Sequence, residues 1–251
     1  MNITQREIFV NYWNDFFPNT PLPIVFYFSN DNDIPQKFEK PSSKKCVVAD
    51  IVTVRNGRSI YFERNSNTCR GASRYFGFSN ELRKDFNYFL SCGIEGEVEG
   101  ERYKKHPELV EKTMGYMPPF EAPGKYLVFK RWDKVEENDL VQGVIFIAQA
   151  DVLSGLFTLT NFDEDDPFGV SSPFSSGCAS LVYYPFQESF KEYPKAVLGM
   201  FDVSARPYVS SEELSFALPM KKMERIIGNI EQSFLITKSW EKIQKRIKNY
   251  Y

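Results

Sequence analysis

The residues of this sequence with the clearest capacity for chemistry are its four cysteines. Cys69 follows a polar turn in which Asn67 or Thr68 can cap a helix, and Cys178 follows a turn in which Ser176 or Gly177 can, so each cysteine is expected within the first turn of a helix. Unpaired N–H groups at a helix start favour a thiolate, which predicts lowered thiol pKa values at both positions. Cys46 stands at the front of a third expected helix. Cys92 is expected in the last turn of a fourth, which makes it the weakest candidate for a free thiolate.

These thiols could form either a metal-ion site or an iron–sulfur site. The sequence has one histidine, His106, so a site with a pair of histidines is excluded. Iron–sulfur chemistry needs thiolates and no histidine. No two cysteines form a close C-x-x-C pair, so spacing alone gives a cluster no support. From the residue types, we hypothesise a metal or iron–sulfur site at Cys69 and Cys178, with Cys46 and Cys92 as further ligands. Such a site would give the protein a redox role and an electron-transfer partner. Buried thiols that only pack remain an alternative.

The neighbours of the cysteines suggest a different function, the binding of a small anionic molecule without a metal. Arg70 adds positive charge beside the first thiol, and Gly71 allows a ligand or another backbone to approach closely. The turn at Gly177 can present its amides to an anion. Arg206 is expected at a strand end, where an arginine can bind a carboxylate or a phosphate.

A run of acidic residues, 163–166, is a less specific candidate. Such a loop can hold a hard cation, but its spacing is not that of an EF-hand. We interpret it as a solvated loop. Trp132, in the sequence KRWDK, is expected to pack in the core, not to stack on a ligand.

Composition limits the classes of protein. The chain of 251 residues is 42% hydrophobic and 16% aromatic, which is typical of a folded globular protein. Its net charge of -2 argues against a nucleic-acid partner. The N-terminus lacks the features of a signal peptide, and no apolar run reaches the length of a membrane span. A cytoplasmic location, with reduced cysteines and no membrane partner, is therefore expected.

The expected elements alternate between helices and strands, which favours one mixed α/β (α+β) domain over residues 1–251. The sheet should be mixed and flanked by helices, with a long helical region at the C-terminus. Expected strands are 21–29, 59–63, 125–132, 143–149, 196–206 and 214–219. Expected helices are 4–17, 46–54, a short one from 69, 80–93, 106–117, 150–162 and 220–247, with a further element beginning at Cys178.

Four stretches carry a resemblance to a known family: CRGA at 69–72, FLSCGIEGEVEGERY at 89–103, PFSSGCASL at 173–181 and FDVSARPYV at 201–209. They resemble the archaeal and bacterial family called domain of unknown function 169, or ArCR, over most of the chain. The positions that match its motif are Cys69, Gly71, Ala72, Gly177, Cys178 and Arg206. The resemblance implies a cytosolic prokaryotic protein in which Cys69 and Cys178 are functional. It implies no substrate or reaction.

Overall fold

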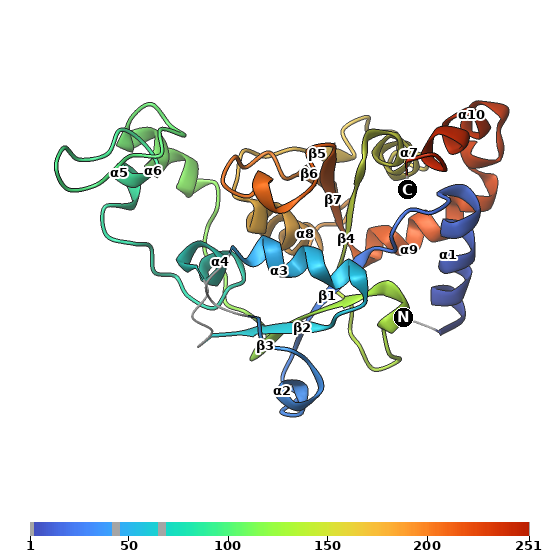
Figure 1. Cartoon of the computed structure of the whole chain (residues 1–251), viewed down its shortest axis with the longest axis horizontal. Helices are drawn as coiled ribbons and strands as arrows, with labels where there is room; N and C mark the ends of the chain where they lie inside the picture. The colour runs from blue at the N-terminus through green and yellow to red at the C-terminus, as the bar shows by residue number, and fades with distance from the viewer. Residues whose placement is uncertain (1–2, 42–45, 65–68, 251) are drawn as a thin grey trace.

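One mixed sheet organises the molecule. Within the residues that the computed structural model describes (3–41, 46–64 and 69–250), seven strands pair in the order β2-β3-β1-β4-β7-β6-β5 (Figure 1). All neighbouring strands are antiparallel except β5 and β6, which are parallel. The strands are β1 (Ile24–Ser29), β2 (Ile60–Glu63), β3 (Tyr126–Arg131), β4 (Gly143–Gln149), β5 (Val170–Ser171), β6 (Ala196–Gly199) and β7 (Glu213–Pro219). The mixed α/β fold expected from the sequence is confirmed.

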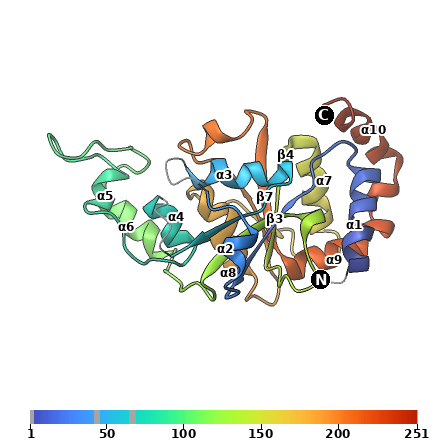
Figure 2. The ribbon, with the colours of Figure 1, turned by 60° about the horizontal axis from the view of Figure 1, so that its bottom comes forward.

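Helices cover both faces of this sheet, and two of them stand apart from it. The described helices are α1 (Ile3–Phe16), α2 (Ile34–Lys37), α3 (Val47–Thr53), α4 (Arg70–Tyr75), α5 (Phe86–Phe89), α6 (Pro107–Gly115), α7 (Ala150–Thr160), α8 (Tyr184–Glu188), α9 (Met220–Asn229) and α10 (Lys238–Ile247). A π-helical segment, Ala179–Tyr183, leads into α8. Figures 1 and 2 show α5 and α6 projecting from one side of the molecule, away from α1 and α10.

Strand β1 shows why the sheet needs a layer of helices on each face. Successive side chains of a strand point to opposite faces. Ile24, Phe26 and Phe28 belong to one core cluster, while Val25 belongs to another. Because the strand is apolar on both sides, it is stable only in the middle of a sheet that is covered twice.

On one face, helices α3, α4 and α8 and the π-helical segment pack over the sheet. Their apolar side chains, among them Val48, Ala72, Leu181 and Phe186, share a core with the strands. Cys178 is buried in this core. Two of the cysteine-containing segments identified in the sequence, those around Cys46 and Cys178, therefore pack into the same layer.

On the other face, α1, α7, α9 and α10 form the second layer, and tryptophans fix its outer helices. The indole N–H of Trp132 donates to the Arg6 carbonyl over 3.1 Å, which fastens α1 to the end of β3. The indole N–H of Trp240 donates to the Phe16 carbonyl over 3.0 Å, which fastens α10 to α1. Both indoles are buried, so each needs such a partner. Trp132 packs in the core, as the sequence predicts.

Two expected elements differ from the structure. The predicted helix over 80–93 is reduced to the four residues of α5, because Asp85 has a φ of 56° and cannot continue a right-handed helix from earlier residues. The predicted strand over 196–206 ends at Gly199, because Met200 has a φ of 68°. Both interruptions lie in segments that border the cavity described below.

The helical C-terminus forms as expected and is divided. α9 and α10 are joined by two 3₁₀ turns, Ile230–Gln232 and Phe234–Ile236, and Thr237 caps α10 by accepting from the Trp240 N–H. Among the described residues, no helix combines the length and the apolar character needed to cross a bilayer.

The tight packing of Gly143 against Phe26 predicts that a larger residue at position 143 destabilises the sheet. Gly143 stands opposite Phe26, and a Cβ added there would overlap the Phe26 ring. We expect Gly143→Ala to lower the free energy of unfolding by about 1–3 kcal/mol, as overpacked core positions do. Gly228→Ala is the matched control, because its added methyl meets no atom within 4 Å and lies in helix α9. Urea denaturation measures both changes. Equal stability of the two variants would contradict this account.

Candidate functional site

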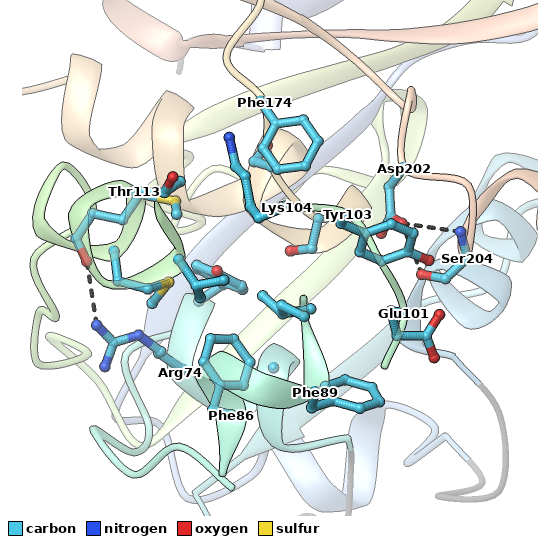
Figure 3. Close-up of a pocket in the computed structure, with 18 of the residues that line it drawn as sticks. Arg74, Phe86, Phe89, Glu101, Tyr103, Lys104, Thr113, Phe174, Asp202 and Ser204 are labelled. Carbon is cyan, nitrogen blue, oxygen red and sulfur yellow. Dashed lines mark hydrogen bonds between the residues drawn. The ribbon is translucent and has the colours of Figure 1, made fainter. Parts of the chain in front are cut away.

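A cavity of about 750 Å³ lies between helix α4, the projecting α5–α6 segment and two loops of the sheet layer. The loops are residues 173–176, before the π-helical segment, and residues 199–204, after β6. Figure 3 shows the labelled side chains around this cavity, with Phe86 and Phe89 on one side of it and Phe174 on the other. The cavity is large enough for a small organic molecule.

Its walls are mainly apolar. Phe86, Phe89, Val110, Met114 and Phe174 are among the residues that line it. Phe174 is 60% exposed, and Phe201 and Val203 in the loop after β6 are 57% and 70% exposed. Exposed apolar side chains gathered at one opening mark a binding surface more often than an inert one.

Charged residues along the wall are predominantly basic. The cationic lining residues are Arg70, Arg74, Arg83, Lys84 and Lys104, and the anionic ones are Glu101 and Asp202. The Arg83 guanidinium lies 4.0 Å from the centre of the Phe89 ring, and the Lys104 ammonium lies 4.2 Å from that of Phe174. These contacts leave the positive charge in place next to apolar surface.

Arg74 has a structural task at this wall. Its side chain is buried and donates to the carbonyls of Asn80 over 3.1 Å and Met117 over 3.3 Å. These two carbonyls lie where the chain leaves α4 for α5 and where it returns from α6. Arg74 therefore holds both ends of the projecting segment against α4.

Cys69 is itself the N-cap of α4, one position earlier in the helix than expected. Its Sγ accepts a hydrogen bond from the Ala72 N–H over 3.4 Å, and the residue is exposed on the cavity wall. Asn67 and Thr68, the expected caps, lie outside the described residues. Arg70 and Gly71 also line the cavity, and a Cβ added to Gly71 meets no atom within 4 Å. The stretch CRGA thus opens onto this cavity.

The turn before Cys178 is held by a carboxylate. Asp202 accepts a hydrogen bond from the Gly177 N–H over 2.9 Å, so this amide already has an anionic partner. The Ser176 hydroxyl lies 3.3 Å from the Cys178 Sγ. Gly177 has little space around it, because an added Cβ would lie 2.8 Å from that of Ala205. Gly177 therefore serves packing, and its amide faces the protein's own Asp202.

The expected thiolate at Cys178 is wrong. Burial raises the pKa of the Cys178 thiol well above its ordinary range, and the negative charge of a nearby Cys69 thiolate raises it further. Burial also raises the pKa of Cys46. Desolvation disfavours the charged form of a thiol and outweighs the N–H groups of a short helix start.

The four cysteines divide into two groups. Cys46, Cys69 and Cys178 lie close enough for the charge of Cys69 to act on both of the others. Cys92 is exposed in the projecting segment, and it is not part of the cavity wall. No group of three or more His, Cys, Asp or Glu side chains in the described part of the chain is arranged to hold a metal ion. The donor set as it stands does not fit a closed metal site.

Arg206 lies outside the cavity wall and binds the protein's own backbone. Its guanidinium donates to the carbonyls of Ser210 over 3.0 Å, Ser211 over 2.8 Å and Glu213. It therefore closes the loop that leads into β7. The structure does not bring Arg206 and Arg70 to one site.

The acidic run 163–166 is exposed at Asp163, Asp165 and Asp166, as expected of a solvated loop, and two of its members also pair with helix α9. Glu164 forms an ion pair with the buried Lys222 and a second one with Arg225 over 3.0 Å. Asp163 pairs with the same arginine over 2.9 Å. These contacts fasten the loop after α7 to the second helical layer.

The mixed sheet and the cavity together define a class, an α/β protein with a mainly apolar cavity whose charged lining residues are mostly basic. A family model described as uncharacterised ArCR, domain of unknown function 169, matches residues 18–229, and the chain belongs to this family. No curated protein and no solved structure matches the chain. All four stretches that carry the family resemblance contribute residues to the cavity wall.

Several residues of the wall are absent from the sequence-based candidates. Tyr103 and Lys104 lie within a segment that the sequence predicts only as a charged loop, and Phe174 and Asp202 lie within the stretches that carry Cys178 and Arg206. The available signal is the cluster of aromatic residues within loops rich in Ser, Gly and Asp. Such side chains lack an assigned strand or helix face to bury them, which is typical of residues that border a cavity.

The raised pKa of Cys178 predicts a pH dependence of stability. Above about pH 8.5 the thiol of the unfolded chain loses its proton, while folded Cys178 retains it. The free energy of unfolding should therefore fall as pH rises, by up to about 1.4 kcal/mol per pH unit from this residue. We expect Cys178→Ala to reduce the slope, and Cys92→Ala, at an exposed position, to leave it unchanged. Denaturant titrations at successive pH values test this expectation, and identical slopes in the three proteins would refute it.

Proposed function

We propose that this protein binds a small molecule with an apolar body and an anionic group in the cavity beside α4. The observation that carries the proposal is the composition of the wall, which is mainly apolar and whose charged residues are mostly basic. The proposed ligand is anionic, as in the hypothesis drawn from the sequence, but some of the residues proposed to surround it differ. Arg70 and Gly71 belong to the proposed site, whereas Gly177 and Arg206 do not.

The apolar body of the ligand is supported by the side chains of the projecting segment. Phe86 and Phe89 lie across the cavity from Phe174 (Figure 3), and Val110, Met114 and Phe201 line the same cavity. Burial of a ligand against such side chains contributes roughly 25 cal/mol for each Å² of apolar surface removed from water. This contribution favours a molecule with rings or a hydrocarbon chain over an inorganic anion.

The anionic group is supported by cations that are not used elsewhere. Within the described ranges, Arg70 forms no hydrogen bond or ion pair with another side chain, and it lines the cavity next to Cys69. Arg83 and Lys104 contact aromatic rings and still present their charge. Arg74 is excluded as an anchor, because backbone carbonyls occupy its guanidinium.

Metal or iron–sulfur binding is the second candidate, favoured by the proximity of Cys46, Cys69 and Cys178. Thiolates are the ligands of iron–sulfur clusters and of soft metal ions. The three thiols would have to rearrange to bind a metal ion, and Cys92 would have to come from the projecting segment. Metal and sulfide analysis with a visible absorption spectrum of protein purified without oxygen tests this candidate. Stoichiometric iron and sulfide that are lost in Cys69→Ser would support it, and colourless, metal-free protein would reject it.

The role of Arg70 can be tested with two probes that share a ring system. 8-Anilinonaphthalene-1-sulfonate is anionic, and N-phenyl-1-naphthylamine lacks the sulfonate. We expect Arg70→Gln to weaken the binding of the anionic probe by about 5- to 30-fold, the loss of one charge-assisted interaction, and to leave the neutral probe nearly unaffected. Fluorescence titration measures both affinities.

Lys242→Gln is the control for that measurement. It removes one positive charge from an exposed position on α10, in the helical layer on the other face of the sheet. Both affinities should stay at the wild-type value. An equal loss of both probes in Arg70→Gln, or an equal effect of the two variants, would argue against an anion at Arg70.

The open space at Gly71 offers a second test, in which the cavity is filled. Gly71→Phe places an aromatic ring into the cavity from a position where an added Cβ meets no atom within 4 Å. We expect binding of both probes to fall by about tenfold or more, because the ring competes for the same apolar surface. Gly228→Phe, equally open and on α9, should bind both probes like the wild type. Undiminished binding in a folded Gly71→Phe protein would place the probes elsewhere.

A further inference from the structure

Three cysteines lie at the starts of three helical segments of one layer, Cys46 and Cys69 with an extended backbone and Cys178 already with a helical one. Cys46 immediately precedes α3, Cys69 precedes α4, and Cys178 precedes the π-helical segment. The starts of α3 and of the π-helical segment touch, because the Val48 side chain lies 3.1 Å from a Cβ built at Gly177. The thiols therefore gather where these segments begin, on one side of the sheet.

Cys69 lies on the cavity wall, and Cys178 is buried directly behind that wall. Cys69 lines the cavity directly, and Ser176, whose hydroxyl lies 3.3 Å from the Cys178 Sγ, lines it from the adjacent turn. Tyr75 at the far end of α4 also lines the cavity, and its ring lies 5.9 Å from that of Tyr183 in the π-helical segment. Helix α4 and the segment of Cys178 thus pack against each other along their length.

The electrostatics of the thiols agree with this geometry. After burial, the charge of Cys69 is the largest influence that raises the pKa of Cys178, ahead of the charge of Cys46. The same Cys69 charge raises the pKa of Cys46, after burial. Cys46 and Cys69 both act electrostatically on Cys178, and Cys69 is the exposed one of the two, at the wall of the cavity.

We propose that Cys69 and Cys178 form a reversible disulfide at the edge of the cavity. This site goes beyond the proposed ligand binding and does not depend on it. The exposed Cys69 thiolate attacks a low-molecular-weight disulfide, whose S–S bond breaks and releases one small thiol. The Cys178 thiol then loses its proton and displaces the second small thiol from Cys69. The two protein sulfurs are oxidised by two electrons in total, and the small disulfide is reduced to two thiols.

The test is oxidation of the full-length protein with glutathione disulfide, carried out on a Cys92→Ser background. This background removes an exposed thiol that could link two chains. We expect the three remaining thiols to fall to one, the intact mass to decrease by two hydrogens, and peptide mapping to find Cys69 joined to Cys178. Dithiothreitol should restore all three thiols. Buried Cys178 should make the second step slow, so an adduct of one glutathione on Cys69 should form first and then disappear as the disulfide forms.

Variants of the other cysteines distinguish this pairing from its competitors. Cys46→Ser, added to the same background, should leave the disulfide intact, whereas Cys69→Ser and Cys178→Ser should abolish it. If Cys178→Ser fails to fold, mapping of the disulfide in the Cys46→Ser protein still decides the matter. A disulfide between Cys69 and Cys46, or glutathione that stays on Cys69 without being displaced, would overturn the proposal.

Discussion

The cavity depends on the hydrogen bonds of one carboxylate, that of Asp202. One of its oxygens accepts from the Gly177 N–H over 2.9 Å, and the other accepts from the Ser204 N–H over 3.0 Å and from its hydroxyl over 2.8 Å. The loop after β6 and the turn before Cys178 are thereby joined at one point. Met200, with its left-handed backbone, lets the chain leave the strand toward that point. Without this junction, neither loop would have a fixed position opposite the projecting segment.

The residues that stabilise the fold are largely different from those that line the cavity. The sheet is apolar on both faces and gains its stability from the two helical layers, which are fixed by buried aromatic side chains and by partnered indoles. The cavity lies beside this body, and its walls come from loops, a short helix and the projecting segment. Residues that line it are therefore under fewer packing constraints than the core. This separation is common where a rigid scaffold positions variable binding loops.

The sequence predicts the strands well, because most of them are short β-branched or aromatic runs bounded by Pro, Gly or Asn. It misjudges the region 80–93, where Leu82, Phe86 and Phe89 have helical spacing but serve the cavity wall in place of a helix face. Periodicity records that a side chain is apolar, and it does not record whether protein or ligand covers that side chain.

At the site, residue types alone identify the stretch Cys69–Gly71 and the turn at Cys178. They do not predict which groups these residues contact. Arg206 has no evident partner in the sequence, and in the structure its guanidinium donates to the carbonyls of Ser210 and Ser211. The sign of the pKa shift at Cys178 follows from its burial, a tertiary property that overrides the local helix start. Arg74, by contrast, draws no attention in the sequence and proves to organise the wall.

The position of Arg74 has a consequence for how the cavity wall can vary. The chain from residue 80 to residue 117 begins and ends at a single guanidinium, so its two ends are held together at α4. This segment supplies one wall of the cavity, and it contributes no strand to the sheet. A change in its length or composition therefore alters that wall, while the sheet and its helical layers can stay as they are.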